Sequence, residues 1–367
     1  MPSPISNLFK PKKVSLQRES NNFDVIRLVA AVLVIVSHAP HVLGLQSPVF
    51  DPFQLVIGHR IGAFAVLTFF IISGYLVAAS WERKESLLAF VAGRVLRIYP
   101  AAIVVVLLSV FLLGPLLTTR TLPEYFSSAL THRYLENMSI FRMHYYLPGV
   151  FGSNPMQSVN ASLWTLPYEV MSYAALGFIG FVGVLGRQAL TVLVFVVFVL
   201  LGLFITPVMD ALVIPLLGID LKTFYPLLLY FLAGTVFYVL RARIPLHAVG
   251  LVGALVGLFL LKDWNYFSYA SLLLLPYVVF SLAFSKPLLS GSRVGFNDVS
   301  YGMYLYAFPV QQLLVFCLGS TLPVAVMVVL SILLTLPLAL ISWRWIERPA
   351  LRLRQKVHQL GRTSTED

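Results

Sequence analysis

Charged side chains are scarce in this sequence. Asp, Glu, Lys and Arg make up 11% of the 367 residues, whereas hydrophobic residues make up 59%, and the mean hydropathy is +0.86. A water-soluble domain is usually about a quarter charged, because its surface must face water. This chain has too few charges to cover such a surface, which indicates that lipid surrounds most of it.

Cysteine is almost absent too, since Cys317 is the only one. A single cysteine excludes an intramolecular disulfide and any cysteine-based metal cluster. No second histidine or carboxylate has ligand spacing relative to His38, so we expect no metal cofactor. The net charge of +11 would raise the question of nucleic acid in a soluble protein. In a membrane chain, basic residues instead set the topology, and no nucleic-acid partner is expected.

The sequence contains long runs of apolar residues. In lipid, every backbone N–H and C=O must be paired within the fold, which leaves helices or a closed barrel. Barrel strands alternate apolar and polar residues, whereas the runs 103–108 and 192–201 are unbroken, so an all-α bundle is predicted. Runs of about 20 residues predict about ten transmembrane helices, near 23–44, 57–80, 98–117, 163–185, 189–206, 222–240, 248–262, 268–285, 300–319 and 323–345.

Basic residues divide unevenly between the loops of this ten-helix frame. With the N-terminus inside, 19 of the 26 Lys and Arg lie on the inner side and 6 on the outer side, which favours cytoplasmic locations for both termini. The predicted organisation is a cytoplasmic tail (1–22), one transmembrane domain (23–349) and a second cytoplasmic tail (350–367). A long outer loop, 118–162, suits contact with a sugar-like acceptor or is an interfacial loop.

The first predicted helix carries Asp24, Arg27 and His38 at membrane depth. Ionisable groups there are costly and usually mark function. Arg27 and His38 are 11 residues apart, close to three turns, so they share one face and lie roughly 16 Å apart along the axis. The alternative is structural: Asp24 pairs with Arg27 at the interface and His38 bonds a neighbouring helix.

Three further segments carry polar groups near or within the membrane. Ser73 and Gly74 in the second helix favour close helix packing. Arg94 and Arg97, one turn apart at the cytoplasmic face, suit phosphate oxygens or anchor the chain on anionic lipid. Glu169 near the start of the fourth helix either pairs there or takes part in binding or chemistry.

Six segments in this order resemble the acyltransferase-3 family of membrane acyltransferases, and they extend from residue 22 to 349. They are Asn22-Phe23-Asp24-x-x-Arg27 with His38, Phe69-Phe70-Ile71-Ile72-Ser73-Gly74-Tyr75-Leu76, Arg94-x-x-Arg97-Ile98-Tyr99-Pro100, Trp164-Thr165-Leu166-x-x-Glu169, Ser300-Tyr301-Gly302-Met303-Tyr304-Leu305, and Trp345-Ile346-Glu347-Arg348-Pro349.

The resemblance implies a membrane O-acetyltransferase of the bacterial cytoplasmic (inner) membrane. Its donor would be cytoplasmic acetyl-CoA, and its acceptor a lipid-linked or polymeric carbohydrate such as an O-antigen or exopolysaccharide, with membrane lipid around it. Family members commonly have a histidine in the Ser-Tyr-Gly-x-Tyr-Leu segment, where this chain has Tyr306-Ala307-Phe308-Pro309. The outer SGNH-type hydrolase domain of some relatives is not expected here.

The resemblance also implies roles for these residues. His38 would be catalytic, either removing the proton of a sugar hydroxyl or forming an acyl-imidazole. Arg94 and Arg97, with Arg27, would hold the phosphates of coenzyme A. Among the matched residues, Asp24 and Trp164 are further candidates for substrate binding. Ser73 is a candidate for stabilising the oxyanion, and Glu169 for positioning the acceptor or polarising His38.

Two rival functions fit parts of the same pattern. A proton-coupled secondary transporter of a small polar solute would use Asp24, His38 and Glu169 as buried ionisable groups. The sequence shows no repeated half and no matched pair of broken helices, which such transporters often have. A non-catalytic subunit of a polysaccharide assembly system would leave the charged face of the first helix without a purpose.

Overall fold

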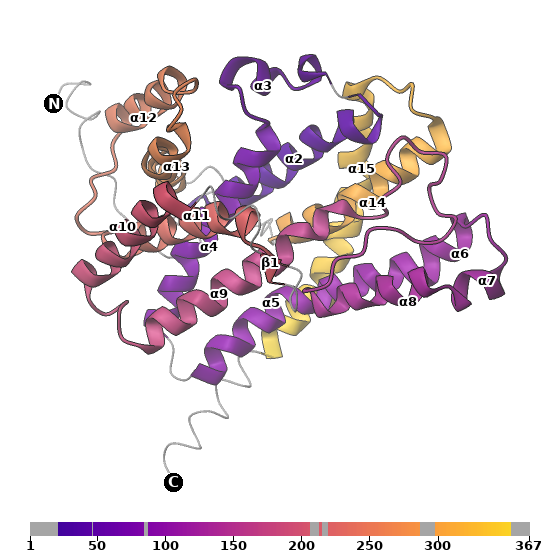
Figure 1. Ribbon diagram of the computed structural model, residues 1–367, viewed down its shortest axis with the longest axis horizontal. Coiled ribbons are helices and arrows are strands. Elements are labelled where there is room, and N and C mark those ends of the chain that lie inside the picture. Colours follow the sequence, from indigo (N-terminus) through magenta and orange to yellow (C-terminus); the bar gives the residue numbers. More distant parts are fainter. Residues whose placement is uncertain are drawn as a thin grey trace, which may run out of the picture.

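The computed structural model of the chain describes residues 21–45, 47–83, 87–205, 213–214, 219–286 and 298–353. These residues form a bundle of helices, and one short antiparallel ladder joins the two-residue strands β1 (Val213–Ile214) and β2 (Ile219–Asp220) (Figure 1). The predicted all-helical class is confirmed. The helices are α2 (Phe23–Val42), α3 (Pro52–Ile57), α4 (Ile61–Glu82), α5 (Leu87–Leu108), α6 (Gly114–Leu117), α7 (Leu122–Ser127), α8 (Ala129–Leu135), α9 (Leu166–Phe181), α10 (Gln188–Ile205), α11 (Leu221–Val239), α12 (Ala248–Leu260), α13 (Phe267–Ala283), α14 (Ser300–Leu318) and α15 (Val324–Ser342).

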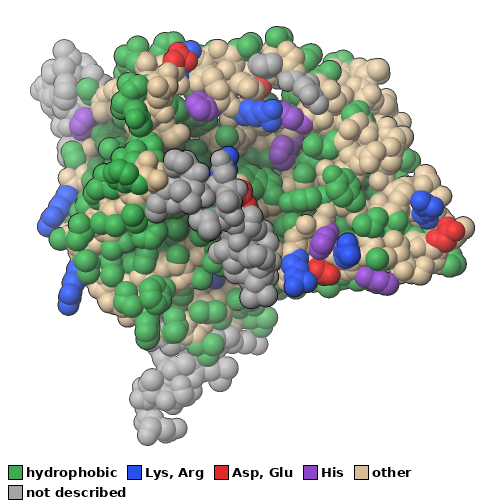
Figure 2. Space-filling model, viewed as in Figure 1, with side chains coloured by type: hydrophobic (Ala, Val, Ile, Leu, Met, Phe, Trp, Pro, Cys, Tyr) green, Lys and Arg blue, Asp and Glu red, His purple; other side chains and the backbone are tan. Residues whose placement is uncertain are grey.

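Among the described residues, six helical segments are long and apolar enough to cross a membrane. They are Phe23–Val42, Ile61–Glu82, Leu87–Leu117, Leu221–Val239, Ser300–Leu318 and Val324–Leu353, and three shorter apolar helices lie at Gln188–Phe204, Ala248–Leu260 and Phe267–Ala283. Apolar side chains cover much of the outer surface (Figure 2). Such a surface suits lipid, and the chain is a multi-pass membrane protein. The count of about ten spans and the cytoplasmic termini stay predictions.

Two helical segments extend beyond their predicted limits. The third was predicted over 98–117, but α5 begins at Leu87 and continues through a π-helical turn (Ser109–Leu113) into α6. Leu, Ala and Arg are strong helix formers, so the helix does not have to start at the membrane face. The last segment continues from α15 through a second π-helical turn (Trp343–Glu347) to Leu353, beyond the predicted end at 345. The charged residues of these two extensions therefore lie within helical segments of the bundle and not in loops.

Helices α4 and α11 pack with their backbones in contact. A Cβ atom added to Gly74 would lie 1.8 Å from the carbonyl oxygen of Phe231, and one added to Gly234 would lie 2.0 Å from that of Ile71. Only glycine allows this approach, so the close packing predicted for the Ser73-Gly74 pair is confirmed. On another side α4 packs on α2, which also contacts α14 and α15.

The segment 118–162, predicted to be a long loop, is folded. It contains α7, α8 and a 3₁₀ turn (Glu136–Ser139). Thr121 and Glu124 form a capping box at α7, and the N–H of Thr121 lowers the pKa of the Glu124 carboxyl by bonding its charged form. Further along, Gln312 of α14 donates through Nε2 to the carbonyl oxygens of Met156 (2.7 Å) and Ser158 (2.6 Å). These bonds fasten the segment over the bundle.

Candidate active site

Helix α2 directs its polar side chains into the interior of the bundle. Arg27 lines one internal cavity and His38 lines another, which lies towards the C-terminal end of the helix. Eleven residues correspond to about three turns, so both side chains leave the helix on nearly the same side. Asp24 lies in the first turn, where a carboxylate interacts favourably with the helix dipole, and it lines neither cavity.

A carboxylate that the sequence did not single out holds two arginines together. The Oδ2 atom of Asp298 accepts from Arg27 Nη1 at 2.6 Å and from Arg97 Nη2 at 2.5 Å. Its Oδ1 atom accepts from the hydroxyl of Ser300 at 2.5 Å. The three charged side chains come from α2, α5 and the residue pair preceding α14, so this ion cluster joins three parts of the bundle. Arg27 pairs with Asp298, which differs from the structural alternative of an Asp24–Arg27 pair.

A second carboxylate extends the cluster. Glu347 Oε2 lies 3.8 Å from Arg97 Nη1, and its Oε1 accepts from the hydroxyl of Ser342 at 2.9 Å. Only 2% of the Glu347 side chain is exposed, and 9% of that of Asp298. Buried charges of this kind need partners, because removing one leaves the other uncompensated in a low-dielectric interior.

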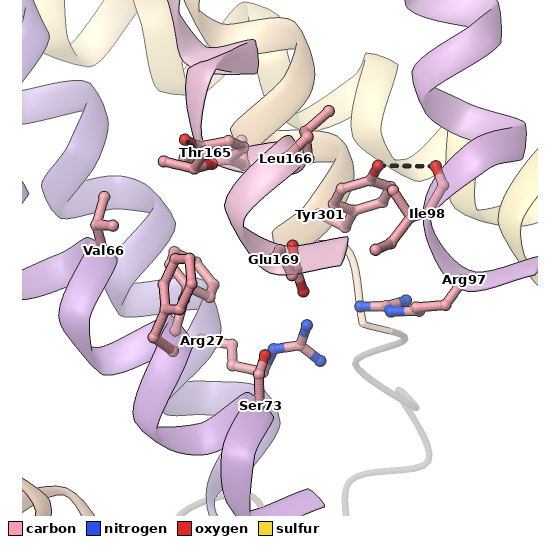
Figure 3. Close-up of a pocket in the computed structure, with 12 residues that line it drawn as sticks. Arg27, Val66, Ser73, Arg97, Ile98, Thr165, Leu166, Glu169 and Tyr301 are labelled. Atoms are coloured by element: carbon pink, nitrogen blue, oxygen red, sulfur yellow. Dashed lines mark hydrogen bonds between the residues drawn. The ribbon is translucent and has the colours of Figure 1, made fainter. Parts of the chain in front are cut away.

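Glu169 lies near the same two arginines. Its carboxylate points towards the guanidinium groups of Arg27 and Arg97 (Figure 3), and it accepts a hydrogen bond from the hydroxyl of Tyr173. Ser73 lines this cavity too. The cavity, which we call the arginine cavity, has a volume of about 40 Å³. A water needs roughly 10–15 Å³ measured in this way, so the space admits a few waters at most.

The structure thus places Glu169 with the arginines and Ser73, whereas the sequence interpretation had grouped Glu169 with His38. The reason lies in the start of α9. A 3₁₀ turn (Ala161–Thr165) precedes the helix and carries Trp164 into the cavity of His38. Glu169 follows five residues later, which is nearly one and a half turns further along α9.

Arg94 and Arg97 diverge from each other. Arg94 lines a separate apolar groove between α5 and α9, of about 310 Å³. It donates to the hydroxyl of Ser80 at 3.3 Å and lies over the rings of Phe90 and Tyr173, at 5.8 and 5.7 Å. A spacing of three residues turns two side chains about 60° apart around a helix, which is enough here to direct them into different spaces.

The cavity around His38 is larger and differs in character. Its volume is about 410 Å³, and we call it the histidine cavity. The His38 ring stands edge-on to Phe308, with centroids 5.4 Å apart. His41 also lines it, and its Nδ1 lies 2.9 Å from the carbonyl oxygen of Ser37. The lining is Val34, Ser37, His38, His41, Arg60, Gly62, Ala63, Val66, Leu67, Met156, Ala161, Trp164, Leu227, Tyr304 and Phe308.

The two cavities adjoin. Val66 of α4 and Tyr304 of α14 line both of them. The hydroxyl groups of Tyr304 and Thr165 are 2.8 Å apart, and Thr165 lines the arginine cavity. The two cavities therefore meet at these side chains, and we call the course along α2 from the arginine cluster by way of Tyr304 to His38 the path.

Several residues of this site were missed by the sequence analysis. Asp298 stands two residues before α14, and its partners are 271 and 201 residues away along the chain, so no local pattern reveals the contact. Tyr301 donates to the carbonyl oxygen of Ile98 at 2.8 Å, and the guanidinium of Arg97 lies 5.5 Å from its ring centroid. Acidic residues are rare in this chain, so an Asp directly before an apolar helix could have been identified as a candidate functional residue.

No group of three or more His, Cys, Asp or Glu is placed to hold a metal ion within the part of the chain that the structure describes.

Comparisons with known proteins agree with the family that the motifs indicated. The sequence profile of acyltransferase 3, described as an acyltransferase domain, matches residues 20–344. A protein of Shigella phage Sf6 named O-acetyl transferase is 30% identical over 348 residues, which cover 90% of this chain and 96% of the relative. Nodulation protein 10 of Rhizobium leguminosarum bv. viciae is 35% identical over 164 residues, covering 42% of this chain and 43% of that protein. No solved structure matches the chain.

Proposed function

The chain belongs to this acyltransferase family, and from that premise we propose that it is a membrane O-acetyltransferase. In this proposal it moves an acetyl group from cytoplasmic acetyl-CoA to a hydroxyl of a surface or exported bacterial glycan. The name of the Sf6 relative supports O-acetyl transfer. The inner membrane is the proposed location, because a donor in the cytoplasm and an acceptor bound for the outside meet there.

One observation supports this function more than any other: the two adjoining cavities lie along one face of α2. A reaction between a cytoplasmic thioester and an outer hydroxyl needs a path open to each side, with a proton acceptor where the two meet. The arginine cavity provides cationic groups at one end, and His38 provides an imidazole at the other. In the orientation that we propose, with both termini in the cytoplasm, the arginine cavity is the one nearer the cytoplasm.

The donor enters in this proposal by parting the arginine cluster. In the structure Asp298 accepts hydrogen bonds from both guanidinium groups, and the arginine cavity, of about 40 Å³, has no room for a pantetheine arm. Coenzyme A carries several phosphate charges, which compete with one carboxylate for Arg27 and Arg97. Arg94, reached through the α5–α9 groove, is a further phosphate ligand in this proposal, and Asp24, in the first turn of α2, is a further candidate for donor binding.

The chemistry proceeds at His38. The imidazole removes the proton of the acceptor hydroxyl as its oxygen attacks the thioester carbon. The tetrahedral intermediate then collapses, the carbon–sulfur bond breaks, and the imidazolium returns its proton to the departing thiolate, leaving free coenzyme A and an ester. Tyr304, which lines both cavities, is a candidate hydroxyl donor to the oxyanion in this proposal.

The remaining candidate residues line either the arginine cavity or the histidine cavity. Ser73 and Glu169 face the donor arm in the arginine cavity, where Glu169 also balances the positive charge of the arginines. Trp164 faces the acceptor in the histidine cavity. Its ring offers a flat apolar surface to a sugar, with an indole N–H as a polar handle.

A labelling experiment separates this enzyme from a proton-coupled transporter, whose buried ionisable groups would resemble these. Purified protein in lipid vesicles is incubated with acetyl-labelled acetyl-CoA and a glycan. The proposal predicts covalent label in the glycan and an equal amount of free coenzyme A. Accumulation of unmodified solute in the vesicles, without label in any glycan, would support the transporter and contradict the enzyme.

A further inference from the structure

Part of the lining of the histidine cavity comes from two elements that lie far apart in the sequence. Helix α14 and the chain that precedes α9 contribute Met156, Ala161, Trp164, Tyr304 and Phe308. We call these five residues the acceptor wall, because the proposed function places the glycan in this cavity. The shape of the wall depends on how the chain before α9 is held against α14.

Helix α14 contains a proline that frees one of its carbonyl groups. A helical carbonyl accepts a hydrogen bond from the N–H four residues further on. The residue four positions after Leu305 is Pro309, which has no N–H. Both residues are buried. A buried carbonyl without a donor costs free energy, so the carbonyl of Leu305 needs a partner from outside its helix.

The side chain of Asn160 supplies that partner. Its Nδ2 donates to the carbonyl oxygen of Leu305 at 2.9 Å. Its Oδ1 accepts from the N–H of Ser162 at 3.2 Å, which caps the 3₁₀ turn before α9. Asn160 is 1% exposed, so water does not compete for either bond. One amide thus fastens the turn that carries Trp164 to α14, at the residue next to Tyr304.

A buried glutamine makes a second attachment about two turns further along α14. The Nε2 atom of Gln312 donates to the carbonyl oxygens of Met156 and Ser158. Its Oε1 accepts from Nδ2 of Asn154 at 2.8 Å. These bonds and those of Asn160 hold the chain before α9 at two points of the same helix.

We propose that Asn160 is a positioning residue for the acceptor, which holds the acceptor wall in the geometry that places the reacting hydroxyl at His38. Gln312 supports the same wall from its other end. This inference rests on the proposed acetyltransferase function and assigns a further residue to its acceptor end. Asn160 lines neither cavity, so it acts through Ala161 and Trp164 and takes no part in the chemical step. Small displacements of a bound reactant lower the rate strongly, which makes such support important.

The outer segment 118–162 also contains a matched control. Asn137 is 2% exposed, its Nδ2 donates to the carbonyl oxygen of His144 at 2.8 Å, and its Oδ1 accepts from the N–H of His144 at 2.7 Å. It therefore makes the same kinds of bond as Asn160, but His144 and its sequence neighbours do not line the histidine cavity. A purely structural role would make the two asparagines behave alike.

The test compares Asn160→Asp with Asn137→Asp in lipid vesicles. Each variant keeps the size of the side chain and its accepting oxygen, and replaces the donating amide by an oxygen that the facing carbonyl repels. The acceptor is surface polysaccharide of the producing bacterium, freed of acetyl groups by mild alkali, and the donor is labelled acetyl-CoA. Initial rates are measured against each substrate, and thermal unfolding is measured in detergent.

Both variants should unfold at a lower temperature than wild type, by similar amounts, because each loses one buried bond. Asn160→Asp should also lower kcat/KM for the polysaccharide by about tenfold, because a displaced wall misplaces the hydroxyl. Its KM for acetyl-CoA should change by less than about twofold, since Thr165 at the other end of the turn stays bonded to Tyr304. Asn137→Asp should keep the kinetic constants of wild type.

Gln312→Glu makes the corresponding change at the second attachment, and it keeps the test decisive if Asn160→Asp does not fold. It should also lower kcat/KM for the polysaccharide and leave the KM for acetyl-CoA unchanged. If the folded variants match Asn137→Asp in every kinetic constant, or impair donor and acceptor binding alike, the positioning role is wrong and the acetyltransferase function stands. If folded wild-type protein acetylates no polysaccharide, the proposed function fails, and this inference fails with it.

Discussion

The two cavities at the ends of the path along α2 differ in their charged side chains and in their size. At the arginine cavity, of about 40 Å³, Glu169 lines the space with Arg27 and Arg97, and Asp298 and Glu347 pair with these arginines. At the histidine cavity, basic and aromatic side chains surround about 410 Å³, and no Asp or Glu lines it among the described residues. An ion-paired cluster around a small space must open before a ligand can enter, whereas the larger cavity already has room for one. In the proposed function, the donor end therefore has to open and the acceptor end is preformed.

The largest expected effect comes from removing the imidazole between the two ends. His38→Ala should lower acetyl transfer by about 100-fold or more, because general base catalysis contributes roughly 10²–10⁴. The variant should stay folded in the membrane, since the ring packs at the edge of an open cavity. The assay is transfer of labelled acetyl to glycan, with His132→Ala, an exposed histidine of α8, as the control. Near-normal transfer by His38→Ala would remove it from the chemistry.

Breaking the ion-paired end should affect stability first. Asp298→Ala leaves two arginines, whose side chains are each 15% exposed, without their shared partner, which should cost up to about 3–5 kcal/mol in the free energy of unfolding. Thermal unfolding in detergent measures the loss as a lower midpoint. Asp263→Ala removes an acid whose side chain is 81% exposed, and its effect should stay within about 0.5 kcal/mol. Equal stability of the two variants would mean that the arginine cluster is not a closed structural unit.

A smaller change should appear at the donor end when one arginine is removed. Arg97→Ala should raise the apparent KM for acetyl-CoA by about tenfold and lower kcat less, because a charge-assisted phosphate contact is lost. Arg97→Lys should recover little, since lysine lacks the planar fork that reaches two partners. Titration of initial rates against acetyl-CoA gives both constants. An unchanged donor KM, with only the acceptor KM raised, would reverse the assignment of the two ends.

The smallest effect is expected at the acceptor wall. Trp164→Ala should raise the KM for glycan by a few fold, in line with about 0.5–1.5 kcal/mol for an aromatic contact, and leave the KM for acetyl-CoA unchanged. The KM of Trp164→Phe for glycan should lie between those of wild type and Trp164→Ala. Separate titrations of donor and acceptor make the comparison. A rise confined to the donor KM would place Trp164 at the wrong end of the path.

The sequence predicted the parts of this site that depend on local spacing. Three turns between Arg27 and His38 set both on the interior face of α2, and the Ser73-Gly74 pair indicated the close approach to α11. The apolar runs predicted a helical membrane protein, although α5 begins well before residue 98.

Contacts between distant segments escaped the sequence analysis. The pairing of Asp298 with Arg27 and Arg97 depends on how α2, α5 and α14 pack, which no single helix encodes. Trp164 lies in the 3₁₀ turn before α9 and Glu169 in the helix itself, and the two line different cavities, which spacing along a single regular helix does not predict. Ala307, in the segment where the resemblance led us to expect a histidine, is buried in one apolar cluster with Ala31 and Ile35 of α2, and its neighbour Phe308 lies edge-on to His38.

In the proposed mechanism, donor and acceptor reach His38 from opposite faces of the membrane. Sealed vesicles with the protein in one orientation test this arrangement, with labelled acetyl-CoA supplied on one side and glycan on the other. We expect labelled glycan only when acetyl-CoA is on the face of the arginine cluster and glycan on the face of the histidine cavity. Equal labelling with both substrates on the same side, or with the two sides exchanged, would contradict it.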